Sequence, residues 1–144
     1  MESSLKEFKK ILRKNSLYVT RQRVALFKLL LNEPKPLPLQ DVANKLDDKL
    51  DLVTVYRNIE SLEKIQVIKK IYTGWSYRVE LSEKFRAHHH HLTCTQCSKT
   101  IRINLSDKIE NELRSIGKSH DFVIKSHEVE LYGLCKSCRS RKDN

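Results

Sequence analysis

The side chains best suited to chemistry in this sequence are four cysteines, which occur as two CxxC pairs. The pairs are Cys94-Thr95-Gln96-Cys97 and Cys135-Lys136-Ser137-Cys138. A CxxC turn lets two thiolates converge on one ion, and two such turns complete a tetrahedral sulfur shell. We therefore expect the two pairs to hold one structural zinc ion in a site closed to catalysis. Thiol redox chemistry is the alternative, although neither pair opens a helix within a βαβ unit.

A run of four consecutive histidines, His88–His91, precedes the first cysteine pair. On a strand, His88 and His90 point to one face while His89 and His91 point to the other, so the run can serve two separate sites. Imidazoles at this density suit zinc, iron(II), nickel or manganese when carboxylates accompany them. The candidate partners elsewhere in the chain are Glu80, Glu110 and His127. Taken singly, each of these is better explained as a surface acid or a hydrogen-bonded core histidine.

The same side chains could form the active site of an enzyme such as a metal-dependent hydrolase. However, no HExxH motif occurs, no HxE precedes a CxxC as in the zinc deaminases, and no nucleophile–base pair is evident. We therefore expect that the protein is not an enzyme. A metal-buffering zinc protein, whose basic N-terminus only aids solubility, is a further alternative.

The positive charge of the chain gathers toward its N-terminus. The 144 residues carry a net charge of +10, and residues 1–28 hold eight basic against two acidic residues. Such an excess is typical of a surface that binds a polyanion, and a solvated helix face is the alternative. No apolar run approaches the roughly 20 residues of a membrane span, and basic residues interrupt the N-terminal apolar stretches. We expect a cytoplasmic protein with no membrane partner.

The sequence predicts helices in the N-terminal half of the chain. Apolar residues recur there at helical spacing, and the segment that follows them is rich in β-branched and aromatic residues. The expected elements are a helix ending near Asn15, a second helix capped by Thr20, a break at Pro34–Pro38, a third helix from Leu39, a fourth from Asp51, and a hairpin over Val67–Glu80 that turns at Thr73-Gly74.

Helices followed by a hairpin are typical of the winged helix-turn-helix module, whose last helix enters the DNA major groove. The side chains of that helix expected to point inward are Leu52, Val55, Ile59 and Leu62. Its opposite face carries Thr54, Arg57, Asn58 and Ser61, with Tyr56 at the edge. Arg57 could then read guanine, while Thr54 and Tyr56 could contact phosphate or a thymine methyl group. The alternative is that Arg57 and Tyr56 merely complete a packed helix.

The second half of the chain is richer in expected strands. We expect a strand at Ile101–Ile103, a helix capped by Ser106, and a strand over Phe122–Leu134 that carries His127 and ends in the second CxxC pair. The predicted fold class is therefore α/β (α+β), with a boundary near residues 80–87 between a helical basic half and a metal-rich half.

Four motifs in this order resemble the ferric uptake regulator (Fur) family of metal-responsive repressors, over nearly the whole chain. They are Val19-Thr20-Arg21-Gln22-Arg23, Val53-Thr54-Val55-Tyr56-Arg57-Asn58-Ile59, His88 to Cys97, and His127-Glu128-Val129-Glu130-Leu131-Tyr132-Gly133. The resemblance implies a winged-helix DNA-binding domain over residues 1–82, a hinge at 83–87, and a metal-binding dimerisation domain over 88–144.

The resemblance also implies the roles of the candidate ligands. Structural zinc would be held by Cys94, Cys97, Cys135 and Cys138. One regulatory site would consist of His88, His90, Glu110 and His127. A second regulatory site, at the hinge, would use Glu80, His89 and His91. The implied DNA contacts are Thr54, Tyr56, Arg57, Asn58, Arg21, Arg23 and Lys14, with the last three on phosphates.

The sequence departs from the family pattern at the hinge site. Pro36 stands where the family usually has a histidine, and Arg102 stands where many members have an acid. Either Glu80, His89 and His91 bind metal with water or another ligand, or sensing has moved to the other regulatory site. The missing acid argues against the peroxide-sensing branch, and the zinc-sensing branch often has a cysteine near Glu80 that this chain lacks.

The function implied is that of a homodimeric, metal-dependent transcriptional repressor of metal-homeostasis genes. When metal-loaded, it would bind a double-stranded DNA operator, an AT-rich inverted repeat. The second divalent metal would be iron(II) or zinc, with manganese and nickel as weaker candidates, so a zinc-sensing member is the alternative to an iron-sensing one.

Overall fold

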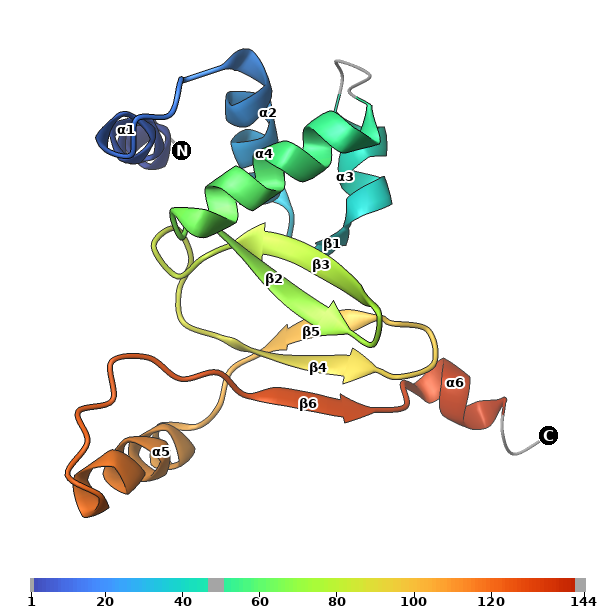
Figure 1. Ribbon diagram of the computed structural model, residues 1–144. Helices are drawn as coiled ribbons and strands as arrows, with labels where there is room; N and C mark the ends of the chain where they lie inside the picture. Colours follow the sequence, from blue (N-terminus) through green and yellow to red (C-terminus); the bar gives the residue numbers. More distant parts are fainter. Residues whose placement is uncertain (1, 47–50, 142–144) are drawn as a thin grey trace. The chain divides into compact units, whose positions relative to one another are not determined.

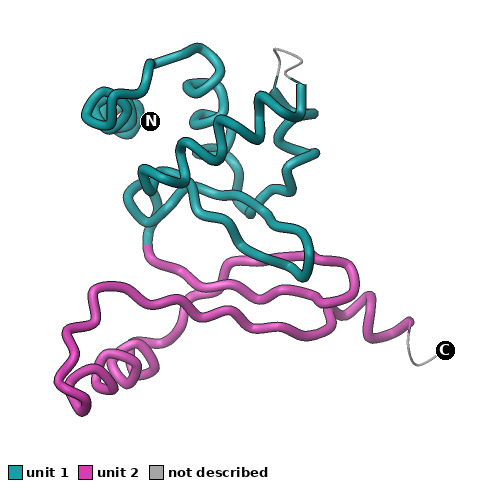
Figure 2. Tube along the Cα trace, viewed as in Figure 1, with its two compact units in different colours: residues 1–87 teal, residues 88–144 magenta. Residues whose placement is uncertain are grey.

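The computed structural model describes residues 2–46 and 51–141. The chain forms two compact units, residues 1–87 and residues 88–144, which Figure 2 shows in different colours. Each unit has its own sheet, and each is described separately below.

The described residues of the first unit form four helices and a small sheet, which can be followed in Figure 1. Its elements are α1 (Glu2–Lys14), α2 (Arg21–Asn32), β1 (Leu37–Pro38), α3 (Leu39–Lys45), α4 (Leu52–Lys64), β2 (Ile68–Thr73) and β3 (Ser76–Leu81). Helices followed by a hairpin confirm the predicted α/β class, and every helix predicted for this half is present.

Two side chains cap the helices at the predicted starts. The Thr20 hydroxyl accepts a hydrogen bond from the Arg23 backbone N–H at 3.3 Å. The Asp51 carboxylate accepts one from the Thr54 N–H at 2.8 Å, and it also receives the Thr54 hydroxyl at 2.9 Å. Each cap satisfies backbone donors that have no partner within the helix, and so it fixes where α2 and α4 begin.

The core of the first unit lies between its helices and its sheet. Phe8 of α1 stacks on Phe27 of α2 with ring centroids 4.2 Å apart, and Phe85 packs edge-on against Phe27 at 4.8 Å. From α4, the core receives Val55, Ile59 and Leu62. Leu52 was also predicted to face inward, but it is 43% exposed, because it is the first residue of α4 and lies beyond the end of the packed stripe.

The sheet of the first unit has the strand order β1-β3-β2. The hairpin of β2 and β3 turns at the predicted Thr73-Gly74. Gly74 has φ +65°, a left-handed conformation that glycine adopts without strain. The short strand β1 was not predicted, because the prolines in Pro34–Pro38 indicate an interruption of regular secondary structure. Pro38 is tolerated there because β1 is an edge strand that pairs on one side only.

The residues expected to form a hinge, 83–87, belong to the first unit. Phe85 packs on Phe27, as described above. The Arg86 guanidinium donates to the backbone carbonyls of Leu30, Leu31 and Glu33, at distances of 2.6 to 3.1 Å. These carbonyls lie at the C-terminal end of α2, where a cation also interacts favourably with the helix dipole.

The second unit is built on a three-stranded sheet with the order β5-β4-β6. Its elements are β4 (His90–Cys94), β5 (Thr100–Ile103), α5 (Asp107–Ser119), β6 (Glu130–Gly133) and α6 (Lys136–Ser140). β4 pairs antiparallel with β5 and parallel with β6. A parallel pair needs a long crossover, which here contains β5 and α5.

The last strand is much shorter than predicted. A strand over Phe122–Leu134 was expected, but β6 covers only Glu130–Gly133, and His127 lies in the segment before it. The register explains the difference, because β6 pairs with β4 from His91↔Glu130 onward and β4 begins only at His90. Residues upstream of Glu130 therefore have no partner strand within the described part of this unit. Helix α6 was not predicted.

Among the described residues, no helix is both long and apolar enough to cross a lipid bilayer.

Candidate metal centres and nucleic-acid interface

The structure brings the four cysteines together at one end of the second sheet. Cys94 ends β4, Cys97 lies in the following turn, Cys135 is the N-cap of α6, and Cys138 lies within α6. Their sulfur atoms all lie within 4.8 Å of one another. Cys97 Sγ and Cys135 Sγ are 3.7 Å apart, which matches the separation of about 3.8 Å between two sulfurs bound tetrahedrally at about 2.3 Å. The cluster can hold one metal ion.

The four sulfurs differ in their acidity. Backbone N–H groups, of Cys135 first and then of Cys97, hold the pKa of Cys94 at about 6. Burial, followed by the hydrogen bond with Cys135, raises the pKa of Cys138 to about 12. At neutral pH the metal-free cluster thus contains a thiolate at Cys94 and a thiol at Cys138. Metal binding at these sulfurs must displace a proton from Cys138.

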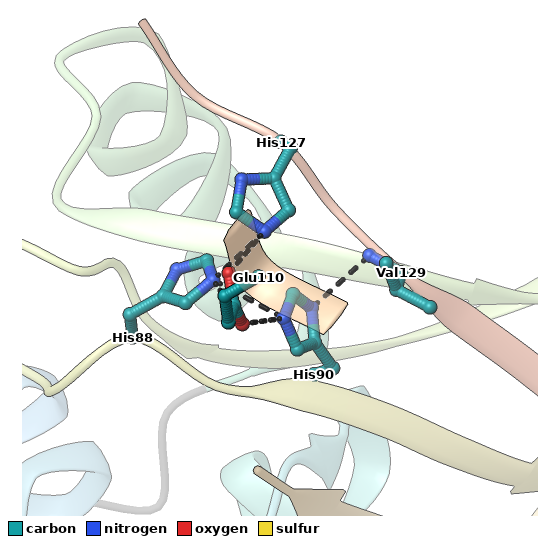
Figure 3. A network of polar contacts seen from close by, with 5 residues as sticks. All are labelled: His88, His90, Glu110, His127 and Val129. Carbon is teal, nitrogen blue, oxygen red and sulfur yellow. Dashed lines mark hydrogen bonds and ion pairs between the residues drawn. The ribbon is translucent and has the colours of Figure 1, made fainter. Parts of the chain in front are cut away.

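A second cluster contains three imidazoles and one carboxylate (Figure 3). His88 Nε2 lies 3.2 Å from His90 Nε2 and 3.2 Å from His127 Nε2. Glu110 places Oε1 2.8 Å from His90 Nε2, and Oε2 2.9 Å from His127 Nε2. One donor atom from each of the four residues lies within 4.8 Å of the other three, so the four side chains can share a single ion.

Four different segments supply this cluster. His88 precedes β4, His90 is the first residue of β4, Glu110 lies in the first turn of α5, and His127 lies before β6. Hydrogen bonding to His90, followed by the positive potential of His127, lowers the pKa of Glu110. The carboxylate is therefore ionised and available as a ligand at neutral pH.

The other two histidines of the run form a pair of their own in the second unit. The His89 and His91 rings have centroids 5.0 Å apart and are nearly perpendicular. His91 is buried, and its Nδ1 lies 2.8 Å from Glu130 Oε1. The predicted alternation of the run between two faces is thus present. Glu80 is a buried residue of β3 in the first unit.

Glu130 was not among the predicted ligands, although it lies within the His127–Gly133 motif described above. The signal that could have found it is the pairing of β4 with β6, which sets Glu130 beside His91. That register depends on the crossover through α5, and the spacing of residues along the chain does not reveal it.

The helix expected to read DNA, α4, exposes two of the four residues predicted to contact it. Tyr56 is 45% exposed, Arg57 is exposed, and Thr54 and Asn58 are partly buried. Of the basic residues expected on phosphates, Lys14 and Arg21 are exposed at the end of α1 and the start of α2. The third of them, Arg23, is partly buried and donates from Nη1 to the Tyr18 carbonyl at 2.8 Å.

A buried lysine that sequence reasoning missed joins α4 to the hairpin. Lys70 of β2 contacts the carboxylates of Glu60 and Glu63, the latter at 2.8 Å. Its ammonium also lies 4.8 Å from the centroid of the Tyr77 ring and 5.9 Å from that of Tyr56. Burial alone would lower the pKa of Lys70, but hydrogen bonds to the two carboxylates raise it. This contact holds α4 in a fixed orientation on β2.

Comparisons with known proteins give a consistent match. The model of the Ferric uptake regulator family matches residues 14–132. The ferric uptake regulation protein of Campylobacter jejuni is 33% identical over 144 residues, covering 96% of this chain and 90% of that protein. That of Bacillus subtilis is 34% identical over 148 residues, covering 99% of each. Among solved structures, the Helicobacter pylori ferric uptake regulator, with three functional metal binding sites, has a TM-score of 0.80 at 26% identity and covers 96% of this chain and 93% of its own.

Proposed function

This chain belongs to the ferric uptake regulator family of metal-responsive regulators, and we propose that it is a homodimeric repressor that binds operator DNA when a divalent metal occupies His88, His90, Glu110 and His127. The protein would act in the cytoplasm, where its operator is. Its relatives are named as regulators and repressors, a class of binding proteins distinct from enzymes.

The geometry of the His88, His90, Glu110 and His127 cluster carries this proposal. Ligands held about 2.0–2.1 Å from one ion lie about 3.0–3.4 Å from each other in tetrahedral or octahedral arrangements. Here the close contacts among the donor atoms are 2.8 to 3.5 Å, and one donor atom from each residue lies within 4.8 Å of the other three. The separations thus fit side chains that share one cation, which would replace the hydrogen bonds among them. Three imidazoles and one carboxylate suit iron(II) or zinc.

The four cysteines support a second, structural role for zinc. Their thiolates would close a tetrahedral shell, leaving no open coordination position for a substrate or a sensed ligand. The shell joins the end of β4 to α6 through Cys94, Cys135 and Cys138. We therefore assign structural zinc to this cluster and sensing to the histidines.

Helix α4 and the charge distribution support DNA as the partner. Arg57 lies on the exposed face of a helix whose start is fixed by Asp51 and whose orientation is fixed by Lys70. In a winged helix the helix before the hairpin enters the major groove, and an arginine there can pair with guanine O6 and N7. The net charge of +6 over residues 1–28 would attract the phosphates, as Lys14 and Arg21 lie exposed in this segment.

The exposed apolar surface of the second unit supports homodimerisation. Leu92 lies between Ile101 on β5 and Leu131 on β6 in the sheet register, and all three side chains are exposed. The segment before β6 also exposes Phe122 and Val123. A contiguous apolar patch of this kind marks a protein interface, and a second copy of the chain would cover it.

Metal binding would control DNA binding by linkage. A metal shifts the protein toward the DNA-binding conformation only by its difference in affinity for the two conformations. His88 is the first residue of the second unit and directly follows Ala87, the last residue of the first. Ordering of His88 and His90 around an ion therefore restricts the chain at the boundary between the two units. Glu80, His89 and His91 remain the proposed ligands of a second regulatory ion.

DNA binding titrated separately with iron(II), zinc, manganese and nickel tests this function. The full-length protein with zinc at the cysteines should bind operator fragments tightly only after a second ion is added. His90→Ala should abolish the metal response, while His120→Ala, at the end of α5 and outside the cluster, should leave it unchanged. No DNA binding under any metal condition at low salt would instead favour a metal-buffering protein.

A further inference from the structure

Two neighbouring histidines of β4 have different hydrogen-bond partners at Nδ1, a donor for His90 and an acceptor for His91. The backbone N–H of Val129 donates to His90 Nδ1 at 3.2 Å (Figure 3). His91 Nδ1 instead faces the Glu130 carboxylate at 2.8 Å. A carboxylate only accepts hydrogen bonds, so His91 must donate from Nδ1. Neutral His91 consequently has its lone pair at Nε2, the atom through which it can bind a metal.

We infer that Glu130 is a positioning residue for a second metal site, at His89 and His91, in which it holds His91 in the tautomer that presents Nε2 to a divalent cation. This inference rests on the proposed metal-dependent function and deepens it. Metal-binding histidines commonly donate their other ring N–H to a carboxylate, which fixes both the tautomer and the ring orientation. The His89 ring lies beside His91, so that both imidazoles can serve one ion.

The sheet register shows why the carboxylate comes from β6. His91 has two cross-strand neighbours, Arg102 on β5 and Glu130 on β6, so the three side chains form one row across the sheet. Arg102 places a positive charge beside His91, and this charge repels a cation bound there. A carboxylate at the same position would attract the cation. Glu130 supplies the negative charge on the opposite side, and so it offsets the repulsion between Arg102 and a bound dication.

One oxygen of the partly buried Glu130 gives independent support. Its Oε2 is buried and, among the described residues, has no hydrogen-bond partner, while its Oε1 contacts His91. A buried carboxylate with one bare oxygen is costly unless a strong donor or nearby positive charge stabilises it. A cation at His91 Nε2 makes the Nδ1–H a stronger donor, so the metal and Glu130 stabilise each other through the imidazole.

Cobalt(II) binding to the full-length protein tests the inference. The parent protein carries His90→Ala, which removes the first regulatory site, and has zinc at the cysteines. Glu130→Leu in this parent should weaken the binding of the remaining cobalt ion by about 10- to 100-fold. Glu130→Gln keeps an acceptor oxygen for His91 Nδ1 and should restore part of the affinity. Glu112→Gln, on the exposed face of α5, is the control and should change nothing.

The tautomer of His91 can be measured separately from metal affinity. Loss of packing alone would not change which ring nitrogen carries the proton. In wild-type protein without added cobalt, two-bond ¹⁵N–¹H correlation spectra should place the His91 proton on Nδ1, and Glu130→Leu should remove that preference. Equal cobalt affinity of the parent and Glu130→Leu proteins, a parent that binds no cobalt, or a His91 proton on Nε2 would each overturn the inference. A different result would contradict the proposed function, namely an unchanged metal response of DNA binding in the His90→Ala protein.

Discussion

Glu110 Oε1 of α5 lies 2.8 Å from His90 Nε2 of β4, and this contact joins the start of the helix to the sheet. Elsewhere α5 is lightly held. Ile109 and Ile116 are exposed, and Gly117 is the buried residue of the helix, packed so closely that an added Cβ would lie 2.7 Å from Ile124 Cγ1. The helix is thus anchored near its end by Gly117 and near its start by Glu110.

We therefore expect metal binding to order the first turns of α5. Backbone amide exchange in this region should slow on metal addition, by up to about 100-fold at a metal concentration about 100 times Kd. Hydrogen exchange read by mass spectrometry measures the effect. Glu110→Gln should remove most of it and Glu112→Gln should retain it. Equal protection of α5 with and without metal would contradict the anchoring role of Glu110.

Arg57→Ala should weaken binding to the specific operator by about 1–3 kcal/mol, because a bidentate contact with guanine would be lost. Fluorescence anisotropy with the metal-loaded protein measures the change, and analytical ultracentrifugation should show an unchanged dimer. Lys118→Ala, which removes an exposed positive charge in the last turn of α5, is the control. A wild-type affinity of the Arg57→Ala protein for its operator would show that this side chain reads no base.

Lys14→Ala should weaken binding to specific and nonspecific DNA alike, because Lys14 lies exposed at the end of α1 and would contact phosphate. The slope of log affinity against log salt concentration should fall in magnitude by about 1. A titration at several salt concentrations measures the slope. A loss confined to the specific operator would mean that Lys14 contacts a base.

Phe8→Ala should destabilise the first unit by about 3–5 kcal/mol, because a fully buried ring stacked on Phe27 would be replaced by a cavity. Chemical denaturation followed by circular dichroism measures this loss. Tyr18→Ala is the control, since Tyr18 is 84% exposed and its removal should change stability by less than about 0.5 kcal/mol. A small effect of Phe8→Ala would mean that α1 contributes little to the stability of this unit.

Zinc binding to the cysteines should depend on pH with a change of slope near pH 6. Because the pKa of Cys138 is about 12, zinc displaces its proton at every accessible pH, and affinity rises with pH. Cys94, with a pKa of about 6, adds a further displaced proton only below that value. The slope of log affinity against pH should therefore be steeper by about one below pH 6. Competition with a chromophoric chelator measures it, and a constant slope would contradict the acidity of Cys94.

Local signals predicted the first unit well. The caps at Thr20 and Asp51 lie beside the backbone donors they satisfy, so the sequence alone shows where α2 and α4 begin. The Thr73-Gly74 turn is similarly local. Leu52 shows the limit of this reasoning, because helical spacing identifies a face of the helix but not where the packed part of that face ends.

The second unit was harder to predict because its strands depend on distant partners. Alternation over Phe122–Leu134 suggested a long strand, yet pairing extends only as far as β4 provides a neighbour. The candidate ligands were all identified from residue type, spacing and the family resemblance. Glu130 and Lys70 were missed because their importance lies in contacts between elements, which no spacing along the chain encodes.

Strand β4 begins with His90 and ends with Cys94, so the histidine cluster and the cysteine cluster lie at opposite ends of a five-residue strand. Loss of zinc from the cysteines would release the end of this strand and the α6 segment that Cys135 and Cys138 attach to it. We therefore expect an order of loading, in which the cysteines must be filled before the histidines can respond. A cell short of zinc would then contain protein that does not register the second ion, whatever the concentration of that ion.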